Sequence, residues 1–598
     1  MSQKNTPFEI GLVMAGAVSA GAYTAGVIDY LLEALDTWQQ EKDKGNLTVP
    51  QHSILIKVMT GASAGGMTTA ITMAELLRSK KADAENRSYL YQAWVKKIDI
   101  TYLLETKDLD SNDGIKSFFD STVIESIASE LIDVKSPPEW KAIPYIDPGL
   151  KLYLTLSNLR GLPYEFKLKG QTGFPYGMTD HADYQYVEIN KDTPKSDWTK
   201  LRNAAVATGA FPIGLASRLI KRDTNEYRIR IAHDGRDISG LMALNSNQNE
   251  PYQFVAVDGG TLNNEPLELA RSVWERFTEE EKKKITSIEQ LEEARAAKRI
   301  SLAQKDYALV LIDPFPNLAG MGTNATDKDT DLLNILSPII GAMRAQSLFK
   351  MEELLRAGDQ EDNDRYLVAP IRYTDTNTKA LNAIACGFLG GFGGFLAEEF
   401  REHDYHLGRR NCQRFLEQFF ILTEEEARKK DWDIKEDYLF PAKDKLKTDE
   451  KRYYPIIPIV KNSDVAKPQG ENNPWPSYQR ERAADLKGGL EVRVDAIMQR
   501  VLPFGWIGKK WVSITLFILP LLIVAGEFIK TERLACNCSV LLEGLKNSYI
   551  LLFQILLLLV FGMLLALRLG KWAIEKRIVN QAYRIFTSQV KDWGIGIE

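Results

Sequence analysis

The sequence predicts an α/β fold, in which a mostly parallel β-sheet carries helices on both faces, followed by a C-terminal two-helix transmembrane hairpin. Short apolar, β-branched runs alternate with helical stretches over the first 420 residues, which is the order that βαβ units produce. The first two of these runs lead directly into small-residue turns that open a helix. Two apolar stretches between residues 511 and 567 each approach the ~20 residues that a membrane-spanning helix requires.

Composition limits the classes of protein. The chain has 598 residues, of which 44% are hydrophobic and 26% are charged, so it can form one large folded domain with additional parts. A net charge of −5 provides no global basic field, so we expect no nucleic-acid partner. The four cysteines match neither a disulfide framework nor a zinc pattern. The N-terminus lacks the basic and long apolar regions of a signal peptide, so we expect the main domain to stay in the cytoplasm.

The first expected element is a strand at residues 8–14, which leads into a loop of small residues and a helix. Small residues let backbone amides approach a ligand, so such a loop can hold an anion or a developing oxyanion. A nucleotide-binding loop also begins in this way. However, no G-x-G-x-x-G follows in register and no G-K-[ST] occurs at this position, which argues against nucleotide binding.

The second expected strand, at residues 54–59, runs into Gly61-Ala62-Ser63-Ala64-Gly65 and then a helix. Strand, G-x-S-x-G and helix in this order are the context of a nucleophile elbow. Gly61 and Gly65 leave room for a cramped turn, so Ser63 can project from the end of the sheet. The amide of Ala64, at the start of the helix, could then donate to an oxyanion. The alternative is a Gly/Ala-rich turn that only packs tightly, because the motif alone often arises by chance.

Later strands alternate with further helical stretches, and one of them ends in Asp258-Gly259-Gly260. Active sites in parallel α/β sheets lie at the carboxyl ends of strands, so an acid there can face the same crevice as Ser63. By itself, D-G-G is usually a turn. A small-residue helix expected before Pro212 indicates only close packing. The later strands are expected at residues 152–156, 254–257, 308–312 and 366–371.

The histidines do not fit a Ser-His-Asp hydrolase. None follows a strand end after the elbow, where such an enzyme would need one, so each is better interpreted as structural or exposed. This pattern favours a serine that is activated directly by a carboxylate. The five are His52, His181, His233, His403 and His406.

Together these motifs resemble the patatin-like phospholipase family, in its bacterial, membrane-anchored form. That family has a glycine-rich oxyanion loop after the first strand, then G-x-S-x-G, and later D-G-G or D-G-A. The same order appears here at residues 16–21, 61–65 and 258–260. The similarity covers roughly residues 8–420, and the ordered set is far more specific than any one motif.

The resemblance implies a patatin-like three-layer α/β/α fold and a Ser63–Asp258 dyad without a catalytic histidine. Asp258 would act as general base, and Ser63 would attack an ester carbonyl to form an acyl-enzyme. The family hydrolyses acyl esters of phospholipids, lysophospholipids or neutral lipids and needs neither metal nor cofactor. The implied oxyanion donors are the amides of Gly16, Ala17, Val18 and Ala64.

One departure from the family concerns the oxyanion loop. The family usually has G-G-G-x-[RK]-G, whereas the aligned stretch here runs from Gly16 through Ala17, Val18, Ser19 and Ala20 to Gly21. Two glycines and the basic residue are absent. Residues other than glycine restrict the backbone torsions of the loop, and a cation that could meet a phosphate is lost.

Beyond the motifs, four parts of the chain are expected. Residues 385–397 combine phenylalanines and glycines without charge, and fit either a mobile apolar flap or, more readily, a buried packing segment. The charged, proline-containing stretch at residues 421–480 fits a linker or an extended arm across the surface, and it leads to a helix near residues 490–501. That helix could pack on the main domain, the commoner case, or lie at the membrane interface. The expected boundaries are 1–420 for the acyl hydrolase domain, 421–508 for linker and helix, 509–571 for the spans and 572–598 for a cytoplasmic tail.

The spans are expected at residues 511–529 and 549–567. Lysine and arginine flank both outer ends, which favours two cytoplasmic termini and a short external loop that contains Cys536 and Cys538. The sequence therefore predicts a two-span membrane protein whose partners are the bilayer and a lipid substrate. The expected activity is that of a phospholipase A or lysophospholipase-type carboxylic ester hydrolase. The alternative is a non-catalytic or acyl-transferring membrane scaffold of the same fold.

Overall fold

A computed structural model of the chain describes most of the main domain and the helix that follows it. The described residues are 6–77, 88–110, 114–132, 142–166, 176–229, 251–276, 307–316, 365–373, 378–380, 382–441, 451–470 and 473–501, with isolated positions in 281–297 and after 575.

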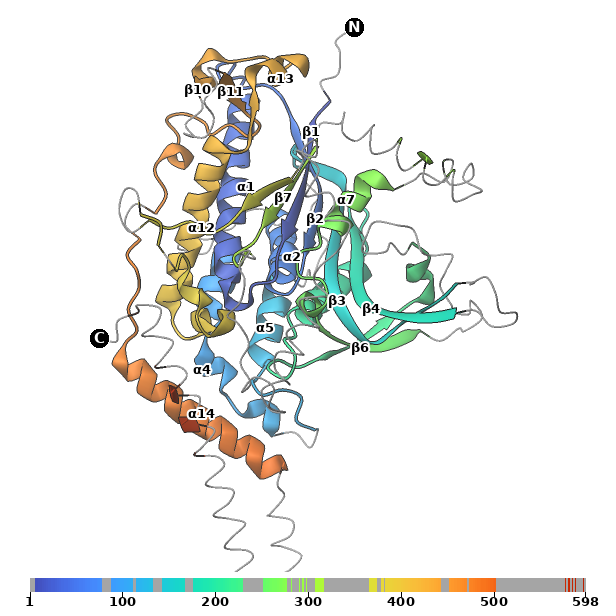
Figure 1. Ribbon diagram of the computed structural model, residues 1–598, viewed down its shortest axis with the longest axis vertical. Coiled ribbons are helices and arrows are strands. Elements are labelled where there is room, and N and C mark those ends of the chain that lie inside the picture. Colours follow the sequence, from blue (N-terminus) through green and yellow to red (C-terminus); the bar gives the residue numbers. More distant parts are fainter. Residues whose placement is uncertain are drawn as a thin grey trace, which may run out of the picture.

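A large mixed sheet forms the centre of the described part of the chain (Figure 1). Eight strands form it in the order β5-β6-β3-β2-β1-β7-β8, and β4 pairs with β3 outside this path. Five neighbouring strands are parallel to one another, namely β3, β2, β1, β7 and β8. Strands β4 and β6 run antiparallel to β3, and β5 runs antiparallel to β6. The bounds are β1 Phe8–Met14, β2 Ile54–Gly61, β3 Ile146–Phe166, β4 Tyr176–Ile189, β5 Arg218–Arg222, β6 Tyr252–Asp258, β7 Tyr307–Ile312 and β8 Arg365–Val368.

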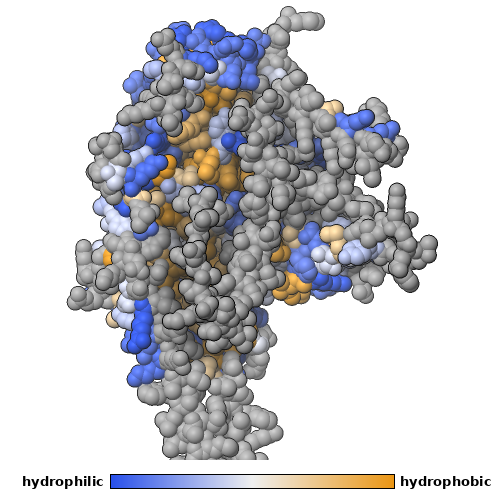
Figure 2. Space-filling model, in the orientation of Figure 1, coloured by the Kyte–Doolittle hydropathy of each residue, from blue (hydrophilic) through white to orange (hydrophobic). Residues whose placement is uncertain are grey.

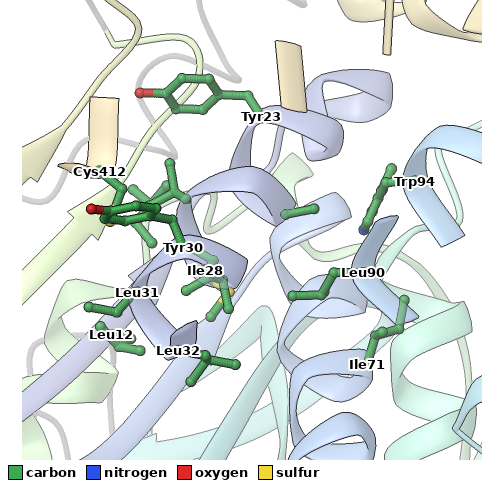
Figure 3. Close-up of a cluster of buried hydrophobic side chains, with 14 of the residues drawn as sticks. Leu12, Tyr23, Ile28, Tyr30, Leu31, Leu32, Ile71, Leu90, Trp94 and Cys412 are labelled. Atoms are coloured by element: carbon green, nitrogen blue, oxygen red, sulfur yellow. The ribbon is translucent and has the colours of Figure 1, made fainter. Parts of the chain in front are cut away.

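Helices cover both faces of this sheet, as the sequence predicts. β1 lies at the centre and is buried on both sides, so nearly all of its residues are apolar. Leu12 packs into a cluster with residues of the helices on one face, and Val13 packs with residues of α7 on the other. The helices of the first face are α1 (Gly21–Asp43), α2 (Ala64–Leu77) and α12 (Glu398–Gln418), and α7 spans Leu267–Glu275. Figure 3 shows part of the first cluster, in which Leu12 and Leu31 lie near Cys412.

The segment after α12 corrects the expectation of a linker. Its residues form a second sheet of three antiparallel strands, β9 (Ile421–Thr423), β10 (Phe440–Pro441) and β11 (Arg452–Pro455). Trp432 stacks on the buried ring of His52, with centroids 3.8 Å apart, and His52 Nε2 lies 2.8 Å from the carbonyl oxygen of Ile456. The linker expectation was wrong here because a few buried aromatic residues attach a segment that is otherwise charged to the main core.

The last described helix, α14 (Arg480–Val501), packs on the main domain. Its Val494 and Arg493 are buried, which agrees with the expectation that this helix packs on the main domain. Within the described ranges, no helix has the length and apolar character needed to cross a bilayer. The expected spans at 511–529 and 549–567, and the loop with Cys536 and Cys538, lie outside those ranges.

Candidate active site

Ser63 occupies a sharp turn between β2 and α2, as the strand-turn-helix pattern predicts. Its φ is +50°, a left-handed conformation that residues other than glycine seldom adopt, and its side chain is only 7% exposed. Gly65 permits the turn, because a Cβ at this position would lie 2.1 Å from the carbonyl oxygen of Met14. The elbow is thus packed directly against the end of β1.

Asp258 lies against Ser63. The Ser63 hydroxyl donates to Asp258 Oδ2 over 2.6 Å, and the amide of Gly260 donates to Oδ1 over 2.7 Å. The backbone of Asp258 is also held, because Ser157 Oγ donates to its carbonyl oxygen over 2.8 Å. Both carboxylate oxygens therefore have a donor, and one faces the serine.

Asp258 lies at the end of β6, which runs antiparallel to its neighbour β3. The sequence analysis expected a mostly parallel sheet and did not predict this antiparallel strand. β3 runs parallel to β2, and its Leu154 pairs with Gly61 at the end of β2. β3 then continues, and its Leu156 pairs with Asp258, the last residue of β6. Because β6 enters from the opposite direction, its end meets the elbow just beyond the end of β2.

Thr208 is a site residue that the sequence analysis missed. It is the last residue of α6 (Lys195–Thr208), and its Oγ1 accepts a hydrogen bond of 2.8 Å from the amide of Ser63. Two residues later, the carbonyl oxygen of Ala210 accepts from the amide of Asp258 over 2.9 Å. The end of α6 thus contacts both members of the pair. No sequence motif predicts that Thr208 accepts from the Ser63 amide, because residues 204–212 indicate only a helix of small residues.

The loop after β1 lies beside Ser63, but one expected donor is already used. The amide of Gly16 donates to the carbonyl oxygen of Asn264 over 3.2 Å, so Gly16 does not supply an oxyanion donor. Its lack of a side chain matters instead, because a Cβ there would lie 2.9 Å from Ser63 Cβ. The amides of Ala17, Val18 and Ala64 have no hydrogen-bond partner among the described residues.

Val18 adopts a left-handed backbone with φ of +49°, where the family usually has glycine. The phenylalanine- and glycine-rich segment lies behind this loop. The Ser19 hydroxyl donates to the carbonyl oxygen of Gly391 and accepts from the amide of Gly394 over 2.9 Å. Most of the segment is buried, so packing, the favoured of the two expectations, describes it. The segment holds the loop in its strained form.

Aromatic rings gather between this segment and the end of α6. Phe392 meets Phe211 edge to face with centroids 5.3 Å apart, and it lies 6.3 Å from Phe119 and 5.7 Å from Phe395. Such rings offer an apolar surface of the kind that an acyl chain requires.

Two acids lie close to the site, on the segments that follow β6 and β7. Burial, with a contribution from the carboxylates of Asp313 and Glu268, raises the pKa of Glu265 to about 7. Burial raises the pKa of Asp313 to about 6. Within the described ranges, no group of three or more His, Cys, Asp or Glu side chains could hold a metal ion.

The described histidines have other contacts. Burial lowers the pKa of His52 to about 3, so this ring is neutral between Trp38 and Trp432. His403 Nδ1 lies 2.8 Å from the carboxylate of Asp404. His233 lies outside the described residues. The polar partner of the Ser63 hydroxyl in the described part of the chain is a carboxylate.

Comparisons with known proteins give one family. The sequence profile of the family described as "Patatin-like phospholipase" matches residues 12–271. A relative from Sinorhizobium fredii (strain NBRC 101917 / NGR234), described as "Uncharacterized protein y4iI", is 30% identical over 563 residues, which cover 83% of this chain and 76% of the relative. The crystal structure of VipD from Legionella pneumophila is similar over 68% of this chain and 67% of that one. Its identity is 13% and its TM-score is 0.23, which is too low to carry a structural inference.

Proposed function

Because the chain belongs to the patatin-like phospholipase family, whose members are lipid acyl hydrolases, we propose that it cleaves acyl esters of phospholipids or lysophospholipids with Ser63 and Asp258. The observation that carries this proposal is the 2.6 Å hydrogen bond from Ser63 Oγ to Asp258 Oδ2. A serine is a weak nucleophile unless a base accepts its proton, and a carboxylate at this distance can accept it directly.

The reaction follows from this geometry in two halves. As Ser63 Oγ attacks the ester carbonyl carbon, its proton passes to Asp258, and the carbonyl oxygen gains negative charge. The amides of Ala17, Val18 and Ala64 are the candidate donors to this oxygen. Asp258 then returns the proton to the departing alcohol, which leaves an acyl group on Ser63. In the second half, a water molecule attacks the acyl carbonyl carbon while Asp258 accepts its proton. Asp258 then returns this proton to Ser63 Oγ as the fatty acid leaves.

The proposal includes a membrane anchor. The spans at residues 511–529 and 549–567 would place the catalytic domain and both termini in the cytoplasm, because lysine and arginine flank their outer ends. An anchored enzyme meets its lipid by diffusion in two dimensions. The aromatic surface around Phe392 supports an acyl substrate.

The test uses the full chain in nanodiscs that contain phospholipids, lysophospholipids and triacylglycerols, with a metal chelator present. Mass spectrometry measures the fatty acids released by the wild type and by Ser63→Ala. We expect release by the wild type alone, and labelling of Ser63 by a fluorophosphonate. Equal release by both proteins would identify a contaminant or another site.

A non-catalytic or acyl-transferring scaffold is the second candidate, and Val18 is the observation that favours it. A β-branched residue at φ of +49° departs from the glycine-rich loop of the family and could weaken the oxyanion donors. Absence of both label and release would support a scaffold. Label together with acyl transfer to an added alcohol, but without fatty acid release, would support a transferase.

A further inference from the structure

Four apolar side chains protrude from neighbouring segments at the α14 end of the molecule. Ile213 is 86% exposed, Val492 is 61% exposed and Tyr102 is 49% exposed, and Ile115 is also exposed. We call these four residues the apolar rim. Single exposed apolar residues are common on protein surfaces. The apolar rim indicates a binding surface only if the segments that carry its residues are held together.

Arg493 provides part of that frame. Its side chain is fully buried, and its Nε donates to the carbonyl oxygen of Phe118 over 2.7 Å. Its two terminal nitrogens bind the carboxylate of Asp108, with Nη2 2.8 Å from Oδ2, and Nη1 also donates to the carbonyl oxygen of Glu105. A buried, bidentate arginine of this kind joins α14 firmly to residues 105–108 and to residues 117–118.

The backbone of residues 118–120 in turn holds the segments that carry the other rim residues. The amide of Phe118 donates to the carbonyl oxygen of Ile213 over 2.8 Å, and the amide of Phe119 donates to Gly214 over 2.9 Å. The amide of Asp120 donates to Leu103, the last residue of α4 (Ile100–Leu103), which carries Tyr102. Figure 1 shows α4 beside α14. The four rim residues therefore project from one hydrogen-bonded unit.

Ile213 is unusual even within the rim. Its φ is +67°, which β-branched residues rarely adopt, and yet its side chain contacts little of the protein. It follows Phe211 of the aromatic group, and Ala210 holds the amide of Asp258. The backbone frame thus directs a strained, exposed isoleucine outward only a few residues from the candidate active site.

We propose that the apolar rim inserts into the surface of the bilayer in which the chain is anchored, so that a lipid can enter the site directly from the membrane. This inference rests on the proposed function and its anchor. Val501 ends α14, and the first expected span begins at residue 511, so the intervening residues reach at most about 35 Å. This end of α14 must therefore stay near the membrane.

The positions of charged residues in the sequence agree with an orientation in which the C-terminal end of α14 faces the membrane. Lys509 and Lys510 precede the first expected span and would meet anionic lipid headgroups. Hydrophilic side chains gather at the opposite end of the molecule, over α13 (Glu424–Lys429) and β10 (Figures 1 and 2), although α14 also carries many charged residues. The chain path therefore favours the bilayer as the occupant that covers the apolar rim.

The test measures the depth of single positions in vesicles of phosphatidylcholine and phosphatidylglycerol. Ile213→Cys and Val492→Cys are labelled with an environment-sensitive dye in full-length protein that also carries Ser63→Ala, Cys536→Ser and Cys538→Ser. Cys386 and Cys412 are buried and should not react. Leu47→Cys is the matched control, because Leu47 is 70% exposed but lies beyond α1, outside the rim. We expect spin-labelled lipids to quench the dye at 213 and 492 at least about threefold more than at 47.

An activity comparison completes the test. Ile213→Asp should lower hydrolysis of vesicle lipid about tenfold, because insertion of one apolar side chain is lost, but should leave hydrolysis of a soluble short-chain ester unchanged. Leu47→Asp should change neither. Equal quenching at positions 213 and 47 would overturn the proposal. The quenching assay contains Ser63→Ala and needs no catalysis, so failure of the proposed hydrolase activity would be recognised separately, by the soluble ester.

Discussion

Asp258→Asn is the substitution that most directly tests the proposed base. The amide of Gly260 donates to Oδ1 over 2.7 Å, so the asparagine should keep its oxygen at that position. Its NH₂ group then faces Ser63 Oγ, where the carboxylate oxygen lay 2.6 Å away. This group cannot accept the serine proton. The shape of the site is preserved while the base is removed.

The expected loss follows from what the carboxylate supplies. A positioned general base contributes roughly 10²–10⁴-fold to rate, and the charge-assisted hydrogen bond from Ser63 Oγ is lost as well. We therefore expect kcat/KM to fall about 10³-fold, which corresponds to about 4 kcal/mol of transition-state stabilisation. The free energy of unfolding should change by less than about 1 kcal/mol, because the backbone contacts of Asp258 remain.

The assay is release of fatty acid from lipid in nanodiscs, together with the rate of fluorophosphonate labelling. Asp313→Asn is the matched control, since Asp313 is also a buried acid that follows a strand of the same sheet, and it should retain activity. A variant Asp258→Asn that hydrolyses lipid within about tenfold of the wild-type rate would refute the role of Asp258 as base.

Three further predictions concern neighbouring groups. Thr208→Val leaves the amide of Ser63 without its acceptor, so it should lower the free energy of unfolding by about 1–3 kcal/mol and slow fluorophosphonate labelling, whereas Thr208→Ser should preserve both. Glu265 holds its proton up to about pH 7 in the folded protein but only to its ordinary pKa of 4.5 when unfolded, so this group's contribution to stability is complete below pH 4.5 and is lost as the pH rises through 7. Glu265→Gln should therefore raise the free energy of unfolding at pH 8 by about 1–3 kcal/mol and have little effect at pH 4. Urea titrations at both pH values measure this difference. An equal effect at both pH values would contradict the raised pKa of Glu265. Arg493→Met leaves Asp108 and three carbonyl groups without their donor, and should lower the unfolding temperature while hydrolysis of a soluble ester continues below that temperature. An unchanged unfolding temperature would contradict the role given to Arg493.

The central part of the fold could be predicted because its signals are local. The strand at residues 8–14 has the bounds expected from its apolar run. Strand β2 was expected to end at residue 59 and ends at Gly61. The turn around Ser63 follows from the glycines at both of its flanks. In each case the residues that define the structure are neighbours in the chain.

The remaining features depend on contacts between distant segments. The acceptor role of Thr208 exists only because α6 ends beside the elbow, and no pattern within residues 204–212 reports it. The loss of Gly16 as a donor arises from Asn264, which is far away in sequence. Likewise, β9 and β11 are only three and four residues long and lie in a charged stretch of the chain, so composition alone favours a linker. Pairing with β11 stabilises β9, and burial of Tyr453 and Tyr454 stabilises β11.

The central position of β1 has a consequence for how the protein is made. β1 pairs with β7, which begins at residue 307, so one edge of the first strand to leave the ribosome has no native partner until much of the chain exists. At 5–20 residues per second this interval lasts about 15–60 s. An apolar strand with an open edge can meanwhile pair with other chains. The nascent protein should therefore need a chaperone that shields its N-terminal strands, and co-production of such a chaperone should raise the yield of folded enzyme.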